Sequence, residues 1–309
     1  MKITRRDFVK KGAAVGLALG VPASLHSPFQ SLAAPKPTTT LSMVTGDTVP
    51  ATRKALELLG GMGNFVKRGQ RVVMKPNMSW ARTPDTGANT HPDVVATIAR
   101  MCLDAGAGEV LVLDHTINRP KKCLELTGIE AACKGIKNVY TFAVNEEKFF
   151  RAVTVSRAKA LRTAKIIKDV LDGDVFINIP CAKSHTTTGV TLGMKNLMGI
   201  VWDRKYFHTS VDINQAIADL TSAVKIDLTV LDASRAMVTG GPAGPGKVTR
   251  PRTIVAGTDP VAVDAMGVSL ADWYDQRFTG NQVEHIAAAH SMGLGTLNLQ
   301  EVSVLKADA

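Results

Sequence analysis

The sequence predicts an α/β protein with a mostly parallel, Rossmann-like sheet that carries helices on both faces. Short continuous apolar runs, such as those at 109–114 and 174–179, are typical of strands buried on both sides. They alternate with segments of helical period, such as 92–105, where apolar residues recur every three or four positions. This alternation favours parallel strands joined by helical crossovers.

The predicted elements follow in order along the chain. We expect strands at 71–74, 109–114, 139–143, 174–179, 227–231, 252–256 and 301–305. We expect helices at 92–105, 121–133, 212–224, 260–271 and 282–289. In sheets of this class, ligands bind beyond the C-terminal ends of the strands.

The N-terminus resembles a twin-arginine export signal. Arg5 and Arg6 precede Phe, Val and Lys at 8–10, and a Gly/Ala-rich apolar run follows at 12–21. That run is too short for a permanent membrane span, and the small residues before Ala33 suit cleavage near it. The resemblance implies export to the periplasm by the twin-arginine translocase, which carries folded and often cofactor-loaded proteins. An uncleaved anchor or an ordinary secretory signal is the alternative.

The predicted organisation is a signal peptide at 1–33, a Pro/Thr-rich linker at 34–45 and a single α/β domain at 46–309. The formal charge of +10 stays positive when the basic signal is removed, which favours anionic small-molecule ligands. Aromatic residues make up only 5% of the chain, and no basic run interleaves with them. We therefore expect no nucleic-acid partner.

Four cysteines, Cys102, Cys123, Cys133 and Cys181, contain no C-x-x-C pair. We therefore expect no cysteine-ligated iron–sulfur cluster. Cys123 and Cys133 could form a disulfide in an oxidising compartment, and buried free thiols are the alternative.

Polar clusters follow four of the predicted strands. Lys, Asn, Asp and His side chains at four strand ends favour one shared ligand site. The clusters are Lys75-Pro76-Asn77, Asp114-His115, the segment 180–189 and Asp232-Ala233-Ser234-Arg235.

The third cluster carries the chemistry that we consider most informative. Lys183 and His185 open a Thr/Gly-rich turn that leads into an apolar stretch containing Lys195 and Asn196. Histidine transfers protons near neutral pH or binds a metal, and a desolvated lysine can act as a nucleophile. The structural alternative is that Lys195 reaches solvent and His185 caps a helix.

A Gly/Pro-rich segment at 239–247 offers backbone N–H groups to an anion. It lacks the G-K-[ST] ending of a phosphate-binding P-loop, because Val248 follows Lys247. Gly240, Gly241, Gly244 and Lys247, with the arginines at 250 and 252, could cradle a ligand or cofactor. The alternative is a mobile loop that covers the site.

Two residues are expected at helix starts, and three histidines are given no role. Asp259 suits an N-cap. His91 either caps the helix after it or faces the pocket. His285 and His290 are five residues apart, a poor spacing for a helical metal pair, and His208 lies apart from both.

The pattern resembles the domain-of-unknown-function family 362, DUF362, over about residues 70 to 275. The matching features are Lys75-Pro76-Asn77, His91-Pro92, Gly106-Ala107-Gly108, Pro180 with Lys183-Ser184-His185, Gly193-Met194-Lys195-Asn196-Leu197-Met198-Gly199, Gly240-Gly241-Pro242 and the segment 256–265. Some members carry a ferredoxin-like cysteine module, which is missing from this sequence.

The stretch from His185 through Gly193-Met194-Lys195 to Gly199 is also similar to a segment of nickel-dependent lactate racemases. The resemblance implies a nickel pincer cofactor tethered to Lys195, with His185 as a proton-transfer or metal-adjacent residue. It also implies hydride transfer at a hydroxyl-bearing carbon. The racemase segment reads Gly-Arg-Lys and has a proline soon after, whereas this chain has Met194 and no proline before Gly199.

The sequence thus predicts an exported enzyme that acts on a small anionic or hydroxylated molecule with a metal or organic cofactor. We expect His185, Lys195 and Lys183 to be catalytic, and His185 with Asp232 to bind any metal. Lys75, Asn77 and Asn196 are expected to bind the cofactor. A non-catalytic periplasmic binding protein, or an accessory subunit of an exported redox complex, is the alternative.

Overall fold

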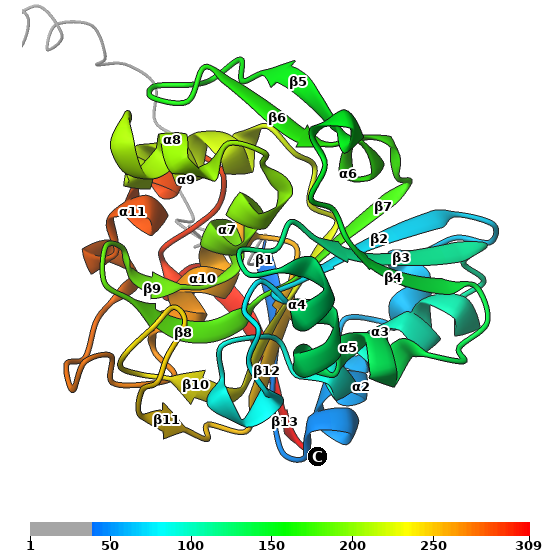
Figure 1. The fold of residues 1–309 in the computed structure, drawn as a ribbon. Coiled ribbons are helices and arrows are strands. Elements are labelled where there is room, and N and C mark those ends of the chain that lie inside the picture. Colours follow the sequence, from blue (N-terminus) through cyan, green and yellow to red (C-terminus); the bar gives the residue numbers. More distant parts are fainter. Residues whose placement is uncertain (1–38) are drawn as a thin grey trace, which may run out of the picture. The chain divides into compact units, whose positions relative to one another are not determined.

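An 11-stranded sheet runs through the part of the chain that the computed structural model describes, residues 39–309 (Figure 1). The main path of strands is β13-β1-β12-β10-β7-β2-β3-β4. From β10 through β7, β2 and β3 to β4, each strand is parallel to the next, whereas β12 is antiparallel to both β1 and β10. The predicted mostly parallel sheet with helices is therefore confirmed.

The elements have the following bounds. The strands are β1 (Thr39–Thr45), β2 (Arg71–Pro76), β3 (Glu109–Asp114), β4 (Val139–Ala143), β5 (Phe150–Thr154), β6 (Thr163–Ile167), β7 (Val175–Ile179), β8 (Cys181–His185), β9 (Gly189–Thr191), β10 (Leu228–Met237), β11 (Val248–Thr249), β12 (Thr253–Gly257) and β13 (Val302–Asp308). The α-helices are α2 (Thr48–Leu58), α3 (Pro92–Asp104), α4 (Pro120–Thr127), α5 (Ile129–Cys133), α6 (Lys168–Asp172), α7 (Gly193–Asn196), α8 (Arg204–Thr209), α9 (Ile213–Ser222), α10 (Pro260–Val268) and α11 (Glu284–Ser291).

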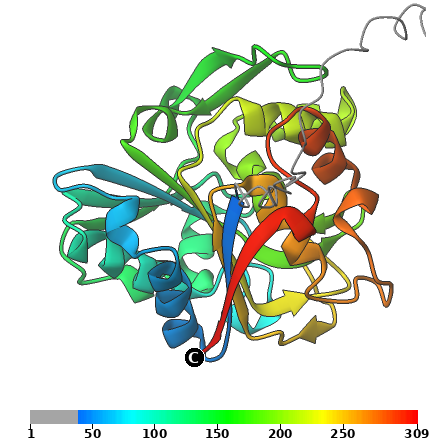
Figure 2. The same cartoon turned by 180° about the vertical axis from the view of Figure 1, so that it is seen from behind.

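Two hydrophobic cores lie on opposite faces of the sheet. Successive strand side chains point to opposite faces, so Val73 joins one core while Val72 and Met74 join the other. Helices α2, α3 and α5 cover the second core, and α7, α9, α10 and α11 cover the first. The view from behind shows α2 against the edge where β1 and β13 lie together (Figure 2).

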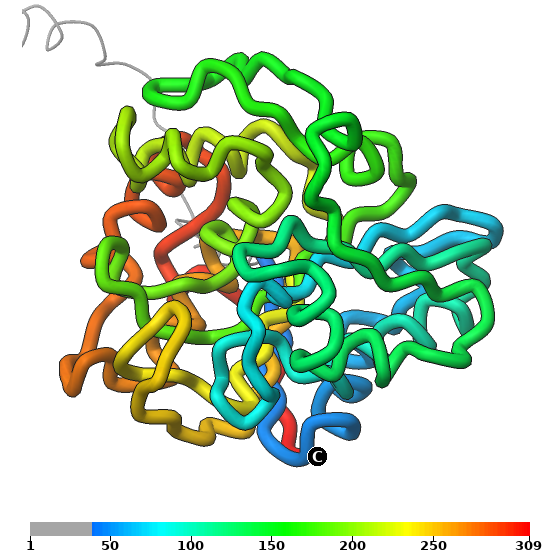
Figure 3. Tube along the Cα trace, in the orientation of Figure 1, coloured from blue at the N-terminus to red at the C-terminus, as the bar shows by residue number. Residues whose placement is uncertain are grey.

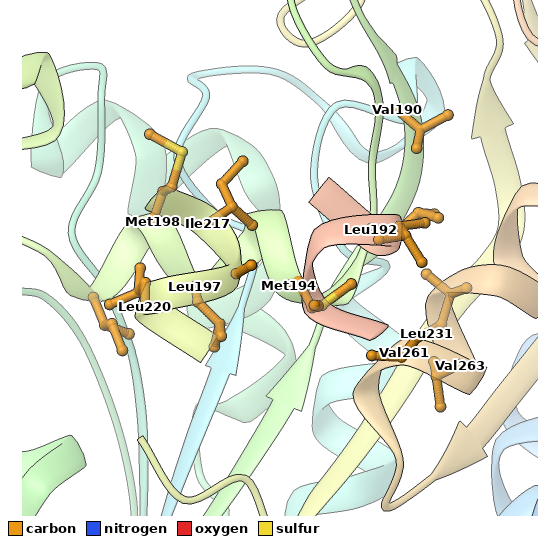
Figure 4. Packing of buried hydrophobic residues seen from close by; sticks show 14 of the residues in the cluster. Val190, Leu192, Met194, Leu197, Met198, Ile217, Leu220, Leu231, Val261 and Val263 are labelled. Carbon is orange, nitrogen blue, oxygen red and sulfur yellow. The ribbon is translucent and has the colours of Figure 1, made fainter. Parts of the chain in front are cut away.

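The first core packs most closely around the short helix α7. Met194 and Leu197 lie between α9, which contributes Ile217, and α10, which contributes Val261 (Figure 4). These side chains are fully buried. The apolar stretch that surrounds Lys195 in the sequence is thus part of the core, and it holds that lysine in the interior.

Helix starts are capped as the sequence suggested. The His91 side chain accepts a hydrogen bond from the Asp93 N–H at 3.2 Å, and the Asp259 carboxylate accepts one from Ala262 at 2.8 Å. These bonds satisfy amide groups that a helix cannot pair internally. The N-cap prediction for Asp259 is confirmed, and of the two alternatives left open for His91 the structure shows the cap.

The linker prediction is wrong for residues 39–45, which form β1 between β12 and β13. Leu41 and Val44 are fully buried, and the threonines are β-branched residues that suit a strand. We gave too much weight to threonine as a loop residue. The rest of the predicted linker and the predicted signal peptide lie outside the described residues.

Three other boundaries also differ from the prediction. The helix expected at 121–133 is broken at Gly128, whose φ of +74° separates α4 from α5. Strand β10 continues to Met237, so Asp232 is a mid-strand residue and not a strand-end residue. Residues 181–185 form strand β8 and not a loop, because they pair with β10 and β9.

Helix α2, helix α8 and the hairpins β5–β6 and β8–β9 were not predicted. All four cysteines are buried and free, which decides between the two alternatives for Cys123 and Cys133. Within residues 39–309, every helix is too short or too polar to cross a bilayer.

Candidate functional site

A cavity of about 470 Å³ opens beyond the C-terminal ends of β2 and β3, beside the β8–β9 hairpin. Six residues that we predicted to be catalytic or cofactor-binding line it, namely Lys75, Asn77, Lys183, His185, Lys195 and Asn196. The lining comprises Lys75, Asn77, Ser79, Trp80, Ile117, Lys183, His185, Thr186, Thr187, Thr191, Lys195, Asn196, Met198, Gly199, Arg204, Lys205, His208 and Pro242.

An ion pair between Lys75 and Asp114 forms the floor of this site. Their side chains have no exposed surface, and the Nζ–Oδ1 distance is 2.9 Å. The other carboxylate oxygen of Asp114 accepts hydrogen bonds from the Met78 N–H at 3.0 Å and the Ser79 hydroxyl at 2.8 Å. Burial lowers the pKa of Lys75, and the carboxylate of Asp114 opposes that shift.

Three asparagines extend the ion pair into a connected network. The Asn196 carbonyl oxygen accepts from Lys75 Nζ and from Asn77 Nδ2, each at 3.0 Å. Its amide group donates to Asn178 Oδ1 at 2.9 Å, and Asn178 donates to the Gly193 carbonyl at 2.9 Å. Because these polar groups are buried and paired with one another, each one restrains the orientation of the next.

Helix α7 is held from the other side by the buried carboxylate of Asp264. This carboxylate accepts from the Gly193 N–H at 2.6 Å and the Met194 N–H at 2.9 Å. Burial raises the pKa of Asp264 to about 7 in spite of these two bonds. A Cβ atom on Gly193 would lie 2.7 Å from Asp264 Oδ1, so glycine is needed for this approach.

Two further lysines face the cavity without a carboxylate partner. Lys183 Nζ donates to the Ala88 carbonyl, and to Asn77 Oδ1 at 3.2 Å. Lys195 Nζ is placed 3.3 Å from Met198 Sδ, a weak acceptor. Burial lowers the pKa of Lys195 to about 7, with a smaller contribution from the charge of Lys183. Near neutral pH, a substantial fraction of this amine is therefore uncharged.

His185 lies at the turn of the β8–β9 hairpin. The Thr187 N–H donates to its Nδ1 at 3.1 Å, which places the proton of the neutral ring on Nε2. Burial, and then the charges of Lys195 and His208, lower the pKa of His185 to about 3. The ring is therefore a neutral hydrogen-bond donor at Nε2 around pH 7.

Sequence reasoning missed the contribution of α8. His208 stacks on His185 with ring centroids 6.4 Å apart, and Arg204 and Lys205 also line the cavity. Arg204 is held by hydrogen bonds to the carbonyls of His115 and Thr116. The spacing of Arg204 and His208, four residues apart, places them on one helix face, and this was the available signal.

His285, which we had also left out, is fully buried, and neither ring nitrogen has a hydrogen-bond partner among the described residues. Burial, with a contribution from Lys195, lowers its pKa to about 3. It does not line the cavity.

The predicted metal ligand Asp232 lies outside the cavity lining, in contrast to His185. Its carboxylate accepts hydrogen bonds from the His91 N–H at 2.7 Å and from the Ser234 hydroxyl at 2.6 Å. It therefore links β10 to the start of α3. Within residues 39–309, no group of three or more His, Cys, Asp or Glu side chains is arranged to hold a metal ion.

The glycine segment reaches the cavity only at its start. The Gly241 N–H donates to the Ser184 hydroxyl at 3.1 Å, and the adjacent Pro242 lines the cavity. Gly240, Gly244 and Lys247 are not part of the lining, and Lys247 pairs with Asp275 at 3.0 Å. The segment packs against β8 through its backbone and leaves its lysine on the surface.

We predict that Gly199→Ala breaks the floor of the site. A Cβ atom there would lie 2.1 Å from Asp114 Oδ1 and 2.6 Å from Lys75 Cε. Separating this buried pair should lower the free energy of unfolding by about 3 kcal/mol in urea titrations. Gly63→Ala, where a Cβ meets nothing within 4 Å, is the control and should change it little. Equal stability of the two variants would contradict the role given to Gly199.

Comparisons with known proteins were made against families, sequences and structures. Residues 72–269 match the family model described as a domain of unknown function, DUF362. A thylakoid-associated protein of Synechocystis sp. is 29% identical over 208 residues, which are 65% of this chain and 63% of that protein. The chain thus matches less than two thirds of the length of that relative.

Two solved structures are similar at low identity. One is a protein from Thermotoga maritima, with 16% identity, a TM-score of 0.43 and coverage of 70% of this chain and 57% of that one. The other is the lactate racemase apoprotein from Thermoanaerobacterium thermosaccharolyticum, with 12% identity, a TM-score of 0.43 and coverage of 72% and 54%. The family match covers well over half of the sequence, and this chain belongs to the DUF362 family.

Proposed function

We propose that this protein is an enzyme that binds a small anionic molecule in the cavity and transfers a proton with His185. One observation carries the proposal. Lysine and arginine side chains line the cavity at five positions, and no aspartate or glutamate lines it. Among these five positions, and within residues 39–309, only Lys75 is matched by a buried carboxylate, that of Asp114. Lys183, Lys195 and Arg204 therefore present cationic or readily protonated groups to one small volume, which favours a carboxylate or phosphate ligand.

The pKa values support a division of roles between His185 and Lys195. A bound anion stabilises protonated groups, so it would raise the low pKa values of both side chains toward neutrality. Lys195 would then stabilise negative charge on the substrate as an ammonium group. His185, which donates from Nε2, would exchange a proton with the substrate.

The first test is a screen of small carboxylates and phosphate esters against their neutral amides and alcohols, by thermal shift. We expect anions to raise the melting temperature and the neutral analogues to leave it unchanged. Lys195→Met should weaken the best ligand by about tenfold or more, because a charge-assisted contact is lost. Binding of neutral analogues as tight as that of the anions would refute the proposal.

His185→Gln separates an enzyme from a binding protein. In an enzyme, this variant should retain the ligand and lose turnover by about 10²-fold or more. His290→Gln is the matched control, because His290 is an exposed residue outside the cavity. Unchanged function in His185→Gln would indicate the alternative, a non-catalytic binding protein.

The pKa of Lys195 also supports attachment of an organic cofactor. An amine with a pKa of about 7 is nucleophilic at neutral pH, and His185 lines the same cavity. These residues fit a group attached through Lys195 Nζ, although a metal would need most of its ligands from that group. Such a group, when bound, supplies hydride transfer at a hydroxyl-bearing carbon.

The reactivity of the Lys195 amine tests both its pKa and whether a cofactor is attached to it. Labelling by a trace acylating reagent should increase through a midpoint near pH 7, because the amine is protonated below that pH and free above it. Labelling of the exposed Lys137 in the same digest is the internal reference. A tethered cofactor would be identified by three results on natively expressed protein. Lys195 would resist labelling, its peptide would carry extra mass, and the protein would contain bound nickel. An unmodified mass without metal would exclude it.

We further propose export by the twin-arginine route, on the basis of Arg5 and Arg6. Replacing both with lysine should retain the protein in the cytoplasm, as measured by fractionation and immunoblotting. Lys2→Gln and Lys11→Gln together, outside the motif, are the control for basic charge. Periplasmic accumulation of the Arg5→Lys, Arg6→Lys variant would exclude this route.

A further inference from the structure

A second polar pocket of about 220 Å³ lies at the N-terminus of α2, apart from the cavity described above. Its lining shares no residue with that cavity. The pocket is formed by Gly46, Asp47, Thr48, His91, Ser234, Arg235, Arg250 and Arg252. Three arginines from one stretch of the chain, residues 235–252, thus meet residues 46–48 and His91, which are far away in sequence. The tube view shows the loop after β2 (cyan) close to the loop after β10 (yellow) (Figure 3). Beside this approach, Arg235 of β10 donates a hydrogen bond to the carbonyl of Asn89 in the loop after β2.

Arg235 is a buried cation whose hydrogen-bonding capacity is largely unused. Its side chain is only 5% exposed, and its Nε has no hydrogen-bond partner in the part of the chain that the structure describes. One terminal nitrogen donates to the Asn89 carbonyl at 2.9 Å, and the other is 3.4 Å from the Ser234 hydroxyl. A guanidinium group has five N–H donors, and buried donors are normally paired. This arrangement indicates that an acceptor is missing beside Arg235.

The carboxylates next to the pocket are already engaged. Asp232 is 3.9 Å from Arg235, beyond hydrogen-bond distance, and accepts instead from the His91 N–H and from Ser234. Asp47 pairs with Arg252 at 2.7 Å. Arg250 is exposed and forms no ion pair within residues 39–309. A third carboxylate, that of Asp85, accepts from Thr83, and this bond, with smaller contributions from the charges of Arg235 and Arg250, lowers its pKa. Arg235 keeps unused N–H donors for a ligand, and Arg250 adds a second cation.

The start of α2 adds a second group of donors. This helix has 11 residues, and the side chain of its N-cap residue Asp47 makes no capping hydrogen bond. The Asp47 N–H donates to the Ala309 carbonyl, so the donors left at this terminus are the amides of Thr48 and Val49. Amides at a helix N-terminus, together with the helix dipole, bind oxyanions.

We infer that this pocket is a binding site for a phosphate-sized oxyanion, held by Arg235, Arg250 and the N-terminus of α2. The pocket volume suits a free phosphate ion or the phosphoryl group of a larger molecule. The site does not depend on the function proposed for the cavity, because the two share no lining residue.

The test is titration of the full chain with inorganic phosphate, followed by calorimetry and by the NMR signals of the Thr48 and Val49 amides. We expect phosphate to shift both signals. Arg250→Gln should weaken this binding by about tenfold. Arg252→Asn, at the second exposed arginine of the lining, should weaken it as well. Lys247→Gln removes the same charge from the neighbouring surface and should leave affinity within about twofold.

Two further results complete the test. They are the direction in which a third variant changes phosphate affinity and the residues whose NMR signals shift. Asp47→Asn should tighten binding by about threefold or more, because it removes a carboxylate and frees Arg252. Phosphate affinity that is unchanged in both arginine variants would overturn the inference. So would phosphate-induced shifts confined to cavity residues such as Thr187. A glycerol phosphate titration then separates a free ion from a phosphoryl group, since only an open site accepts the ester.

Discussion

The buried ion pair between Lys75 and Asp114 is the interaction on which the site depends. It joins the ends of two adjacent parallel strands, with both side chains fully excluded from solvent. A buried pair is held at a large desolvation cost, and loss of one partner leaves an uncompensated charge. Each partner of the pair also holds another part of the site. Asp114 accepts hydrogen bonds from Met78 and Ser79, which order the loop after β2, and Lys75 donates to Asn196 and so orients it. The absence of a side chain at Gly199 is what allows the pair to form here.

The same network explains why the lysines of the cavity stay in the interior. Helix α7 is anchored at one end by Asp264 and along its side by Asn196 and Asn178. Its apolar residues pack into the first core, so Lys195 is carried inside with them (Figure 4). Burial then lowers the pKa of Lys195. A lysine that would be an ordinary cation on a surface helix becomes a titrating group near neutral pH because of the packing around it.

Sequence reasoning was most accurate where a local pattern determines the structure. The strand at Glu109–Asp114, the helix from Pro92 and the caps His91 and Asp259 follow from period and from side-chain chemistry alone. It was least accurate where tertiary pairing decides. Thr39–Thr45 is a strand because β12 and β13 flank it, and Asp232 is inside β10 because β8 and β12 extend that strand past the point where its apolar run ends.

The sequence by itself determined the α/β class and the positive net charge. It also predicted that Lys75, Asn77, Lys183, His185, Lys195 and Asn196 lie together, and the structure places them around one cavity. These depend on residue type, on period and on the rule that parallel strands end at one edge. Only the tertiary structure decided that Asp232 and Lys247 lie elsewhere and that His208 and Arg204 join the cavity. It also decided that the Nε of Arg235 has no hydrogen-bond partner among residues 39–309. Distances between side chains from separate strands, and the burial that sets their pKa values, arise from packing, which no local pattern encodes.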